Sequence, residues 1–299
     1  MDILTIANLK KRFGDKEVLK GVSLSVPEKS VFGFIGKNGA GKTTTMKAVL
    51  GLMETDEGEI YVAGEKVTYG QTKTNRYIGY LPDVPEFYNF MTAYEYLAFC
   101  GEMAGMKKEE IKERCEEMLK LVGLGDEKHR IKGFSRGMKQ RLGIAQALLG
   151  RPKLLICDEP TSALDPVGRK EILDILMAVK EETTVIFSTH ILSDVERICT
   201  DVAFLNDGKI IMQGKIADIK EKNKSKDMVL EFDSIEDMRS VLEKFSECSA
   251  ADNAGLIFKG TDERMFEMLK FIAENKIVVN KVERMERTLE ALFLEVVSE

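Results

Sequence analysis

The stretch that decides the fold of this chain reads Gly36-Lys37-Asn38-Gly39-Ala40-Gly41-Lys42-Thr43-Thr44. Its glycine content disfavours a helix, because glycine loses more conformational freedom on ordering than any other residue. The same glycines favour a loop around an anion, since each reaches positive φ at low cost and has no side chain to keep the anion from the backbone N–H groups. The stretch therefore predicts an anion-binding loop.

The flanking sequence places this loop between a strand and a helix. Residues 31–35 are apolar and favour a strand, and residues 43–50 can form a helix whose positive end faces the loop. Gly36, Gly41, Lys42 and Thr43 match the spacing of a phosphate-binding P-loop. This motif assigns Lys42 to the β/γ-phosphates of a nucleotide and the Thr43 hydroxyl to magnesium. A chance glycine turn before a helix is the weaker interpretation.

A second motif, residues 154–160, ends in two adjacent acids, Asp158 and Glu159. The continuous apolar run before them predicts a strand buried on both faces of a parallel sheet, and such sheets bind ligands at the carboxyl ends of their strands. Asp158 can then hold magnesium, and Glu159 can orient or deprotonate the attacking water. Isolated acids would be interpreted as surface groups, but a P-loop in the same chain favours the catalytic interpretation.

Two aromatic side chains have both a structural and a functional interpretation. His190 follows the apolar run 184–188, which predicts a second buried strand. A lone histidine is usually structural, but at this strand end it could reach a γ-phosphate. Phe13 lies in a predicted turn around residues 14–15, where it is either a core residue or a ring that stacks on a nucleotide base. Both alternatives remain open from the residues alone.

Two loops also carry candidate residues. Ser135 and Gly137 precede an apolar-faced helix, and on local grounds they predict no more than an N-cap turn. Pro82 and Pro85 forbid a continuing helix or central strand, so they predict a rigid loop that presents Asp83.

The composition narrows the class of protein. The 299 residues favour two domains, 31% are charged, and no apolar run approaches the ~18 residues of a membrane span. The first residues lack a signal-peptide pattern. The five cysteines are scattered and form no Cys-x-x-Cys pair, which is typical of reduced thiols in a cytosolic protein. A net charge of −6 argues against broad nucleic-acid binding.

The order of predicted elements gives an α/β domain over residues 1–218 with a helical insert over about 92–150. A charged linker is expected at 219–227, because polar residues dominate there. Residues 228–299 alternate strand and helix in a βαβαβα-like order, which predicts a small α+β accessory domain that docks or stabilises a dimer.

Taken together, residues 36–43, 135–141, 154–159, 162–165 and His190 resemble the ATP-binding cassette (ABC) family of transporter ATPases in order and spacing. The resemblance implies the P-loop NTPase fold of an ABC nucleotide-binding domain, with bound ATP and Mg²⁺. It also implies roles for individual residues: Phe13 as the base-stacking aromatic, residues 36–44 as Walker A, Asp158 and Glu159 as the Walker B acids, residues 162–165 as the D-loop, and His190 as the switch histidine. Lys42, Glu159 and His190 are then the catalytic residues.

Two stretches depart from the family pattern. The signature is usually Leu-Ser-Gly-Gly-Gln, but here Arg136 replaces its first glycine and Met138 its glutamine. This variant and the C-terminal appendix are similar to drug- and antibiotic-export ATPase subunits that pair with a separate membrane permease. Asp83 stands where the family has a Q-loop glutamine. An aspartate is shorter, charged and acceptor-only, so we expect it to ligate magnesium or its water while adding negative charge near the γ-phosphate.

The resemblance further implies a head-to-tail homodimer in which ATP lies between one P-loop and Ser135, Gly137 and Met138 of the second copy. The expected location is peripheral, on the cytoplasmic face of the cell membrane. The alternative, a non-transport cassette ATPase acting on nucleic acid or the ribosome, usually has two cassettes or long coiled-coil insertions, whereas this chain has one Walker A and a short insert. A regulator without turnover is disfavoured by Lys42 and Glu159.

Overall fold

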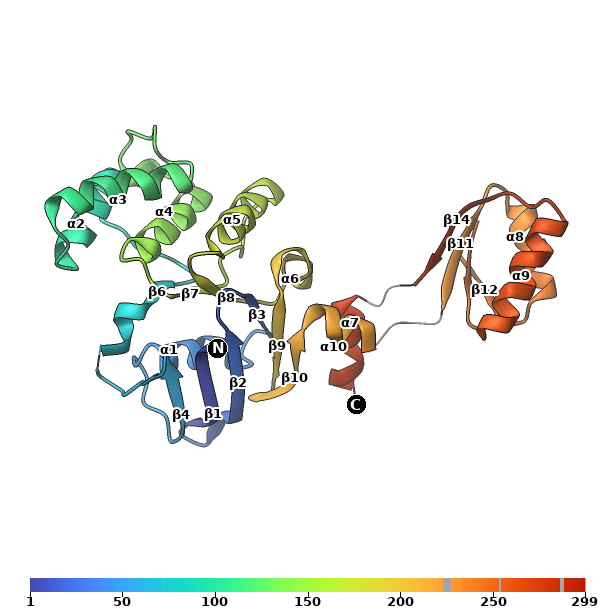
Figure 1. Cartoon of the computed structure of the whole chain (residues 1–299), viewed down its shortest axis with the longest axis horizontal. Coiled ribbons are helices and arrows are strands. Elements are labelled where there is room, and N and C mark those ends of the chain that lie inside the picture. Colours follow the sequence, from blue (N-terminus) through green and yellow to red (C-terminus); the bar gives the residue numbers. More distant parts are fainter. Residues whose placement is uncertain (72, 223–226, 253, 286–287, 299) are drawn as a thin grey trace. The chain divides into compact units, whose positions relative to one another are not determined.

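The computed structural model describes residues 1–71, 73–222, 227–252, 254–285 and 288–298. The chain divides into two compact units, Met1–Ile216 and Ala217–Glu299. Both are drawn in Figure 1.

The first unit contains two sheets. The smaller is antiparallel with strand order β2-β1-β4-β5, and its strands are β1 (Asp2–Phe13), β2 (Lys16–Pro27), β4 (Glu57–Val62) and β5 (Glu65–Lys66). The larger has the order β10-β9-β3-β8-β7-β6 and is parallel except for β10. Its strands are β3 (Val31–Ile35), β6 (Ile78–Leu81), β7 (Leu154–Asp158), β8 (Thr184–Thr189), β9 (Asp201–Asn206) and β10 (Lys209–Lys215).

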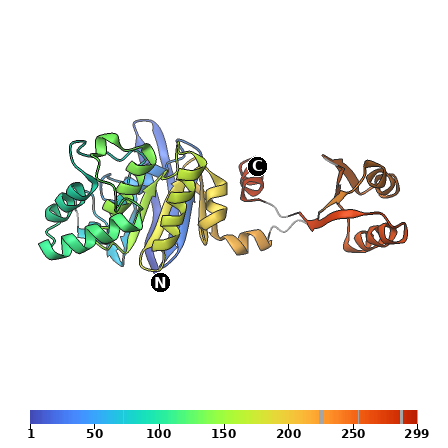
Figure 2. The ribbon, with the colours of Figure 1, turned by 90° about the horizontal axis from the view of Figure 1, so that it is seen from above.

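One hydrophobic core of this unit lies between the two sheets and includes residues of α1 (Lys42–Val49). Along β7, Leu154 and Ile156 belong to this core, while every residue of the strand is buried. The other face of the larger sheet is covered by α5 (Pro166–Val179), which contacts β8, and α6 (Leu192–Ile198), which contacts β3. Figure 2 shows these helices opposite the blue strands of the antiparallel sheet. The continuously apolar strands are thus buried on both faces, as predicted.

A helical group follows β6, namely α2 (Ala93–Met103), α3 (Lys108–Leu121) and α4 (Arg136–Leu148), with the 3₁₀ turn η2 (Ile131–Gly133) before α4. A further 3₁₀ turn, η1 (Lys73–Tyr77), precedes β6. Thr92 starts α2 through a capping box with Glu95. The helical insert predicted over about 92–150 is interrupted between α2 and α3, where Gly105 has a φ of 74°. This left-handed conformation ends a helix and suits glycine.

One predicted boundary needs correction. Phe13 was expected in the turn but is the last residue of β1, because β1 and β2 pair up to Phe13 and Lys16. Helix α5 begins at Pro166, since the Asp165 side chain caps it and proline suits the first helical position. Strands β9 and β10 form an antiparallel hairpin.

The second unit contains a four-stranded antiparallel sheet with the order β12-β13-β11-β14. Its elements are β11 (Met228–Phe232), α8 (Ile235–Lys244), β12 (Cys248–Ala251), β13 (Gly255–Phe258), α9 (Asp262–Glu274) and β14 (Val279–Arg284). This βαββαβ order is that of a ferredoxin-like module. Figures 1 and 2 show α8 and α9 on the same face of the sheet. The predicted βαβαβα order was therefore wrong, because it omitted β12.

Two further helices flank this module, α7 (Ile216–Lys222) and α10 (Leu289–Ser298). The linker predicted at 219–227 is helical up to Lys222, and its residues 223–226 lie outside the described residues. The predicted final helix is present as α10, with Leu289, Leu292 and Phe293 buried. In the part of the chain that the structure describes, no helix combines the length and hydrophobicity needed to cross a bilayer.

Candidate nucleotide-binding site

The glycine-rich loop runs from the end of β3 to the start of α1, and two of its glycines have no room for a side chain. A Cβ on Gly36 would lie 2.6 Å from the carbonyl oxygen of Leu205, and one on Gly41 would lie 2.7 Å from Leu19 Cδ2. Gly41 is also the N-cap of α1 with a φ of 111°. The loop path therefore requires glycine at these positions, and it directs the N-terminus of α1 toward the cavity described next.

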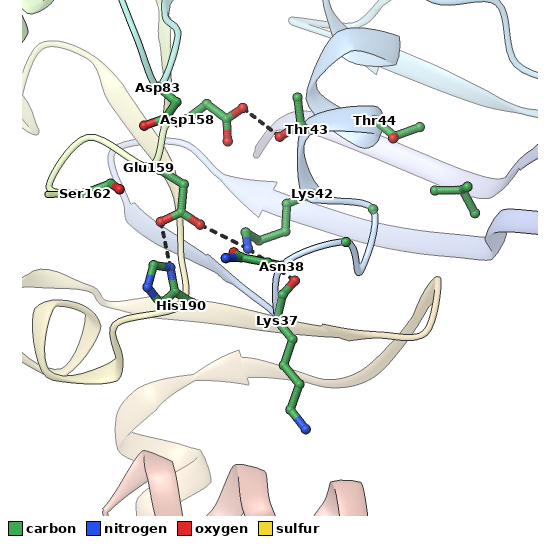
Figure 3. A pocket seen from close by; sticks show the side chains of 13 residues that line it. Lys37, Asn38, Lys42, Thr43, Thr44, Asp83, Asp158, Glu159, Ser162 and His190 are labelled. Atoms are coloured by element: carbon green, nitrogen blue, oxygen red, sulfur yellow. Dashed lines mark hydrogen bonds and ion pairs between the residues drawn. The ribbon is translucent and has the colours of Figure 1, made fainter. Parts of the chain in front are cut away.

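A cavity of about 380 Å³ opens at the carboxyl ends of β3 and β7 (Figure 3). Its volume lies in the range of small-molecule and cofactor sites. The residues that line it come from β2, the loop, α1, the segment after β6, and the ends of β7 and β8: Val18, Lys37, Asn38, Gly39, Gly41, Lys42, Thr43, Thr44, Asp83, Asp158, Glu159, Ser162 and His190.

Lys42 is buried and points its ammonium group into this cavity. Its Nζ donates a hydrogen bond to the Gly36 carbonyl oxygen at 2.6 Å and lies 3.0 Å from Glu159 Oε1. The ion pair leaves this buried cation neutralised, which lowers the cost of keeping it out of water. A phosphate oxygen in the cavity would compete with Glu159 for the same ammonium group.

Asp158 lies beside the first turn of α1 and accepts two hydroxyl hydrogen bonds. Thr43 Oγ1 donates to Asp158 Oδ2 at 2.8 Å, and Ser188 Oγ donates to Asp158 Oδ1 at 2.5 Å. Ser188 was not predicted from the sequence, although the parallel pairing of β7 and β8 sets it directly opposite Asp158. The position of Ser188 near the end of the neighbouring buried strand was the available signal.

Glu159 is held by its backbone as well as by its carboxylate. Its φ of 49° is uncommon for a residue other than glycine, and its N–H donates to both Oγ and the carbonyl oxygen of Ser188, each at 3.1 Å. The side chain lies between Lys42 and His190, whose Nδ1 is 3.0 Å from Glu159 Oε2 (Figure 3). Ser188 therefore orients both acids, because it binds the carboxylate of Asp158 and the backbone N–H of Glu159.

The donor set fits a magnesium ion that is shared with phosphates. Thr43 and Asp158 offer a hydroxyl and a carboxylate, which are the hard oxygen ligands that Mg²⁺ takes. Among the described residues, no group of three or more His, Cys, Asp or Glu side chains forms a metal cage. This agrees with the usual magnesium site of nucleotide enzymes, in which few protein ligands are completed by phosphates and water.

Asp83 lines the same cavity from the segment after β6. Burial raises the pKa of its carboxyl, and the charges of Asp158 and Glu159 raise it further, while Arg136 lowers it. Tyr80 lies in the same acidic surroundings, where burial and then Asp158 raise its pKa to about 12. The acidic edge of the cavity is therefore crowded with negative charge.

Six predicted binding residues do not line the cavity, namely Phe13, Gly36, Ala40, Ser135, Gly137 and Met138. Phe13 is 48% exposed at the end of β1, with Lys11 Nζ 5.6 Å from its ring centroid. Ser135 caps α4 by accepting a hydrogen bond from the Met138 N–H at 3.2 Å, and Gly137 lies between them. The structure also adds a wall residue that sequence reasoning missed, since Val18 lines the cavity from β2. Gly36 and Ala40 shape the loop without lining the cavity.

Comparison with known proteins places this geometry in context. A family model described as ABC transporter matches residues 19–162. Among curated relatives, the uncharacterized ABC transporter ATP-binding protein YxlF of Bacillus subtilis (strain 168) is 38% identical over 305 residues, covering 99% of each chain. The bacitracin transport ATP-binding protein BcrA of Bacillus licheniformis is 38% identical over 225 residues, covering 74% of this chain and 72% of its own.

The solved structures that match this chain also come from ABC ATP-binding proteins. CbiO1 from Clostridium perfringens, part of an ABC transporter complex, matches with a TM-score of 0.69 and 27% identity over 82% of this chain and 96% of its own. The ATP-binding cassette MJ0796, a dimer in a post-hydrolysis state with ADP and Pi, matches with a TM-score of 0.64 and 27% identity over 71% of this chain and 98% of its own. Since the likeness to YxlF extends over nearly the whole of both chains, this protein belongs to the ABC transporter family of ATP-binding proteins.

Proposed function

We propose that this protein is the ATP-hydrolysing subunit of a membrane exporter, with Glu159 as the residue that activates water. The observation that carries the proposal is the position of Glu159, whose carboxylate lies 3.0 Å from both Lys42 Nζ and His190 Nδ1 at the rim of the phosphate-binding loop. A carboxylate between two nitrogen groups at the end of a buried strand suits a base beside a γ-phosphate.

The proposed mechanism starts from the contacts that Lys42 makes. When ATP binds, its phosphates take the Lys42 ammonium group from the Gly36 carbonyl and Glu159. Glu159 then loses its cationic partner and is free to accept a proton from water, while His190 holds the other carboxylate oxygen in place. Thr43 and Asp158 would hold Mg²⁺, which would neutralise the developing negative charge when bound with the phosphates. The loop N–H groups bind the phosphates throughout.

ABC ATP-binding subunits dimerise and pair with membrane permeases, and we assign both kinds of partner to this chain. In the proposed dimer, Ser135, Gly137 and Met138 at the start of α4 contact the ATP held by the second copy. Their position outside the cavity of their own chain supports this role. The two-fold symmetry of such a dimer makes both ATP sites equivalent.

Export and location are inferred from relatives. Those with known cargo are described as bacitracin transport, lantibiotic transport and linearmycin resistance proteins. We propose a related role here, with the subunit attached to a permease on the cytoplasmic face of the cell membrane. The alternative action on nucleic acid or the ribosome has no relative in its favour among these matches, and the net charge of −6 opposes it.

The proposed permease contact is the aromatic segment between Asp83 and α2. Tyr88 and Phe90 are 51% and 65% exposed, and the rings of Tyr88 and Phe99 pack edge to face at 5.7 Å. Exposed rings held in fixed positions are typical of interface anchors. Because this segment follows the cavity residue Asp83 directly, it suits the transmission of nucleotide state to a permease.

We expect Phe90→Asp to abolish copurification of the permease from detergent extract while ATP binding is kept, because a charge replaces an apolar anchor. The matched control is Phe266→Asp, since Phe266 is equally exposed at 65% but lies on α9 of the second unit. Mass spectrometry of the captured proteins measures the outcome. Capture of nucleic acid or ribosomal proteins in place of a multispanning membrane protein would refute the transport assignment.

A second expected result concerns Asp83. Replacing Asp83 with glutamine removes one of the negative charges that crowd this edge of the cavity, so the magnesium concentration for half-maximal ATPase rate should shift by about 2- to 5-fold. A magnesium titration of the ATPase rate measures the shift. The same magnesium dependence in both proteins would show that Asp83 takes no part in the metal site.

A further inference from the structure

Two residues that depart from the family pattern lie beside each other in the folded chain. Asp83 stands where a glutamine is usual, and Arg136 stands where the signature usually has glycine. They are far apart in sequence, yet Arg136 Nη2 lies 3.6 Å from Asp83 Oδ1. One departure introduces a carboxylate and the other introduces a cation next to it.

The backbone of β6 and of the segment that carries Asp83 packs closely against α4, the helix that begins with Arg136. A Cβ on Gly79 would lie 2.1 Å from the Ala147 carbonyl oxygen, and one on Gly143 would lie 2.4 Å from Leu81 Cδ1. At the next turn of α4, the buried Gln140 donates its Nε2 hydrogen bond to the Asp83 carbonyl oxygen at 2.7 Å. The segment after β6 and the start of α4 are therefore packed as one piece.

The surroundings of Asp83 would be stabilised by a nearby cation. Its Oδ1 is buried and has no hydrogen-bond partner among the described residues, and Asp158 and Glu159 add negative charge nearby. Arg136 is the group whose charge favours the ionised form of Asp83. A triphosphate in the cavity would add still more negative charge, so an Asp83 without Arg136 would repel it.

We propose that Arg136 is a positioning residue for Asp83: it holds the carboxylate at the edge of the nucleotide cavity and offsets its charge, so that each departure from the family pattern requires the other. The inference rests on the proposed function, because it assumes that a metal–triphosphate occupies the cavity. Arg136 acts here within its own chain, in addition to any contact that the start of α4 makes in the dimer.

A double-mutant cycle on the full chain tests the pairing. The four proteins are the unmodified chain, Asp83→Asn, Arg136→Ala and the double variant. The probe is equilibrium binding of a fluorescent ATP analogue with Mg²⁺. We expect Arg136→Ala to weaken binding about 3- to 5-fold, the upper end for a partly exposed ion pair, and to have less than about a 2-fold effect when Asp83 is already asparagine.

Two further variants separate this role from a general effect on folding. Arg136→Lys keeps the charge and should retain binding within about 2-fold of the unmodified chain. Arg197→Ala is the matched control, because Arg197 and Asp174 form a pair of similar exposure at 3.0 Å on α6 and α5, away from the cavity. Its affinity should equal that of the unmodified chain. The Arg136→Ala effect should also shrink at high salt.

Three results would overturn the inference. Equal losses from Arg136→Ala in both backgrounds would show that Arg136 acts independently of Asp83. Unchanged affinity combined with loss of ATP-dependent dimers would assign Arg136 to the partner subunit's nucleotide alone. Failure of the unmodified chain to bind the Mg²⁺–ATP analogue would overturn the proposed function together with this pairing, whereas normal binding with an additive cycle would overturn the pairing only.

Discussion

Glu159→Gln is expected to lower ATP turnover by roughly 10² or more while ATP binding is retained. The change keeps the size of the side chain and removes its charge, so the residue can no longer accept a proton from water. It also removes the ion pair with Lys42, which frees the ammonium group for the phosphates. The ATPase rate and the affinity for a fluorescent ATP analogue measure the two effects separately.

The backbone conformation at Glu159 does not depend on the side chain that this substitution changes. Its φ of 49° is stabilised by two hydrogen bonds from its own N–H to Ser188, and neither involves the side chain that changes. Glutamine therefore inherits the same conformation. Glu181→Gln is the control, because Glu181 is exposed and lies in the turn after α5, and it does not line the cavity. It should leave turnover within about 2-fold of the unmodified chain.

The same variant should accumulate dimers in the presence of ATP. If ATP lies between two subunits and is not hydrolysed, the interface that it forms persists. Size-exclusion chromatography with and without ATP measures the dimer fraction. A Glu159→Gln protein that stays monomeric and hydrolyses ATP at the normal rate would contradict both the catalytic role of Glu159 and the ATP-bridged dimer.

The site's main parts were predictable because each is a local pattern. The glycine spacing before Lys42 and the acids after the apolar run of β7 can be recognised without knowledge of distant contacts. Since parallel strands end at the same edge of a sheet, the two patterns were expected to meet, and the structure brings Thr43 and Asp158 to 2.8 Å. The specific roles of these residues remain predictions for the experiments above.

Contacts that depend on strand order could not be predicted in the same way. β3 lies between β8 and β9, and both of these strands are distant from β3 in sequence. β7 pairs with β8 in a register that sets Ser188 opposite Asp158. A single serine near the end of a strand has no motif of its own. The pairing of Asp83 with Arg136 likewise depends on the packing of α4 against β6, which sequence spacing does not reveal.

In the second unit, prediction from the sequence failed for a different reason. β12 consists of Cys248-Ser249-Ala250-Ala251, which lacks the β-branched and aromatic residues that favour strands. Its strand conformation comes from pairing with β13, whose Leu256 and Phe258 belong to the core of the module. Tertiary pairing therefore overrides weak local propensity, and the ferredoxin-like order emerges only once β12 is counted.

Lys42→Ala is expected to lower turnover by about 10²–10³-fold and to weaken ATP binding, the size of effect that follows removal of one strong transition-state contact. Lys42 is the buried cation that faces the predicted β/γ-phosphates, and alanine removes it without altering the glycine loop. The ATPase rate and the ATP affinity are measured together, because loss of ground-state binding alone would change the KM and leave kcat intact.

The nucleotide-free protein offers a second measurement of the same variant. Without Lys42, Glu159 keeps the contact with His190 but loses its ion pair, so the apo protein should lose about 1–3 kcal/mol of stability, as expected when a buried polar group loses its partner. Lys47→Ala on the same helix is the control, since Lys47 is exposed and is not among the residues that line the cavity. If Lys42→Ala and Lys47→Ala hydrolysed ATP equally well, the phosphates could not lie against the ammonium group of Lys42, and the loop from Gly36 to Thr44 would not be the site of catalysis.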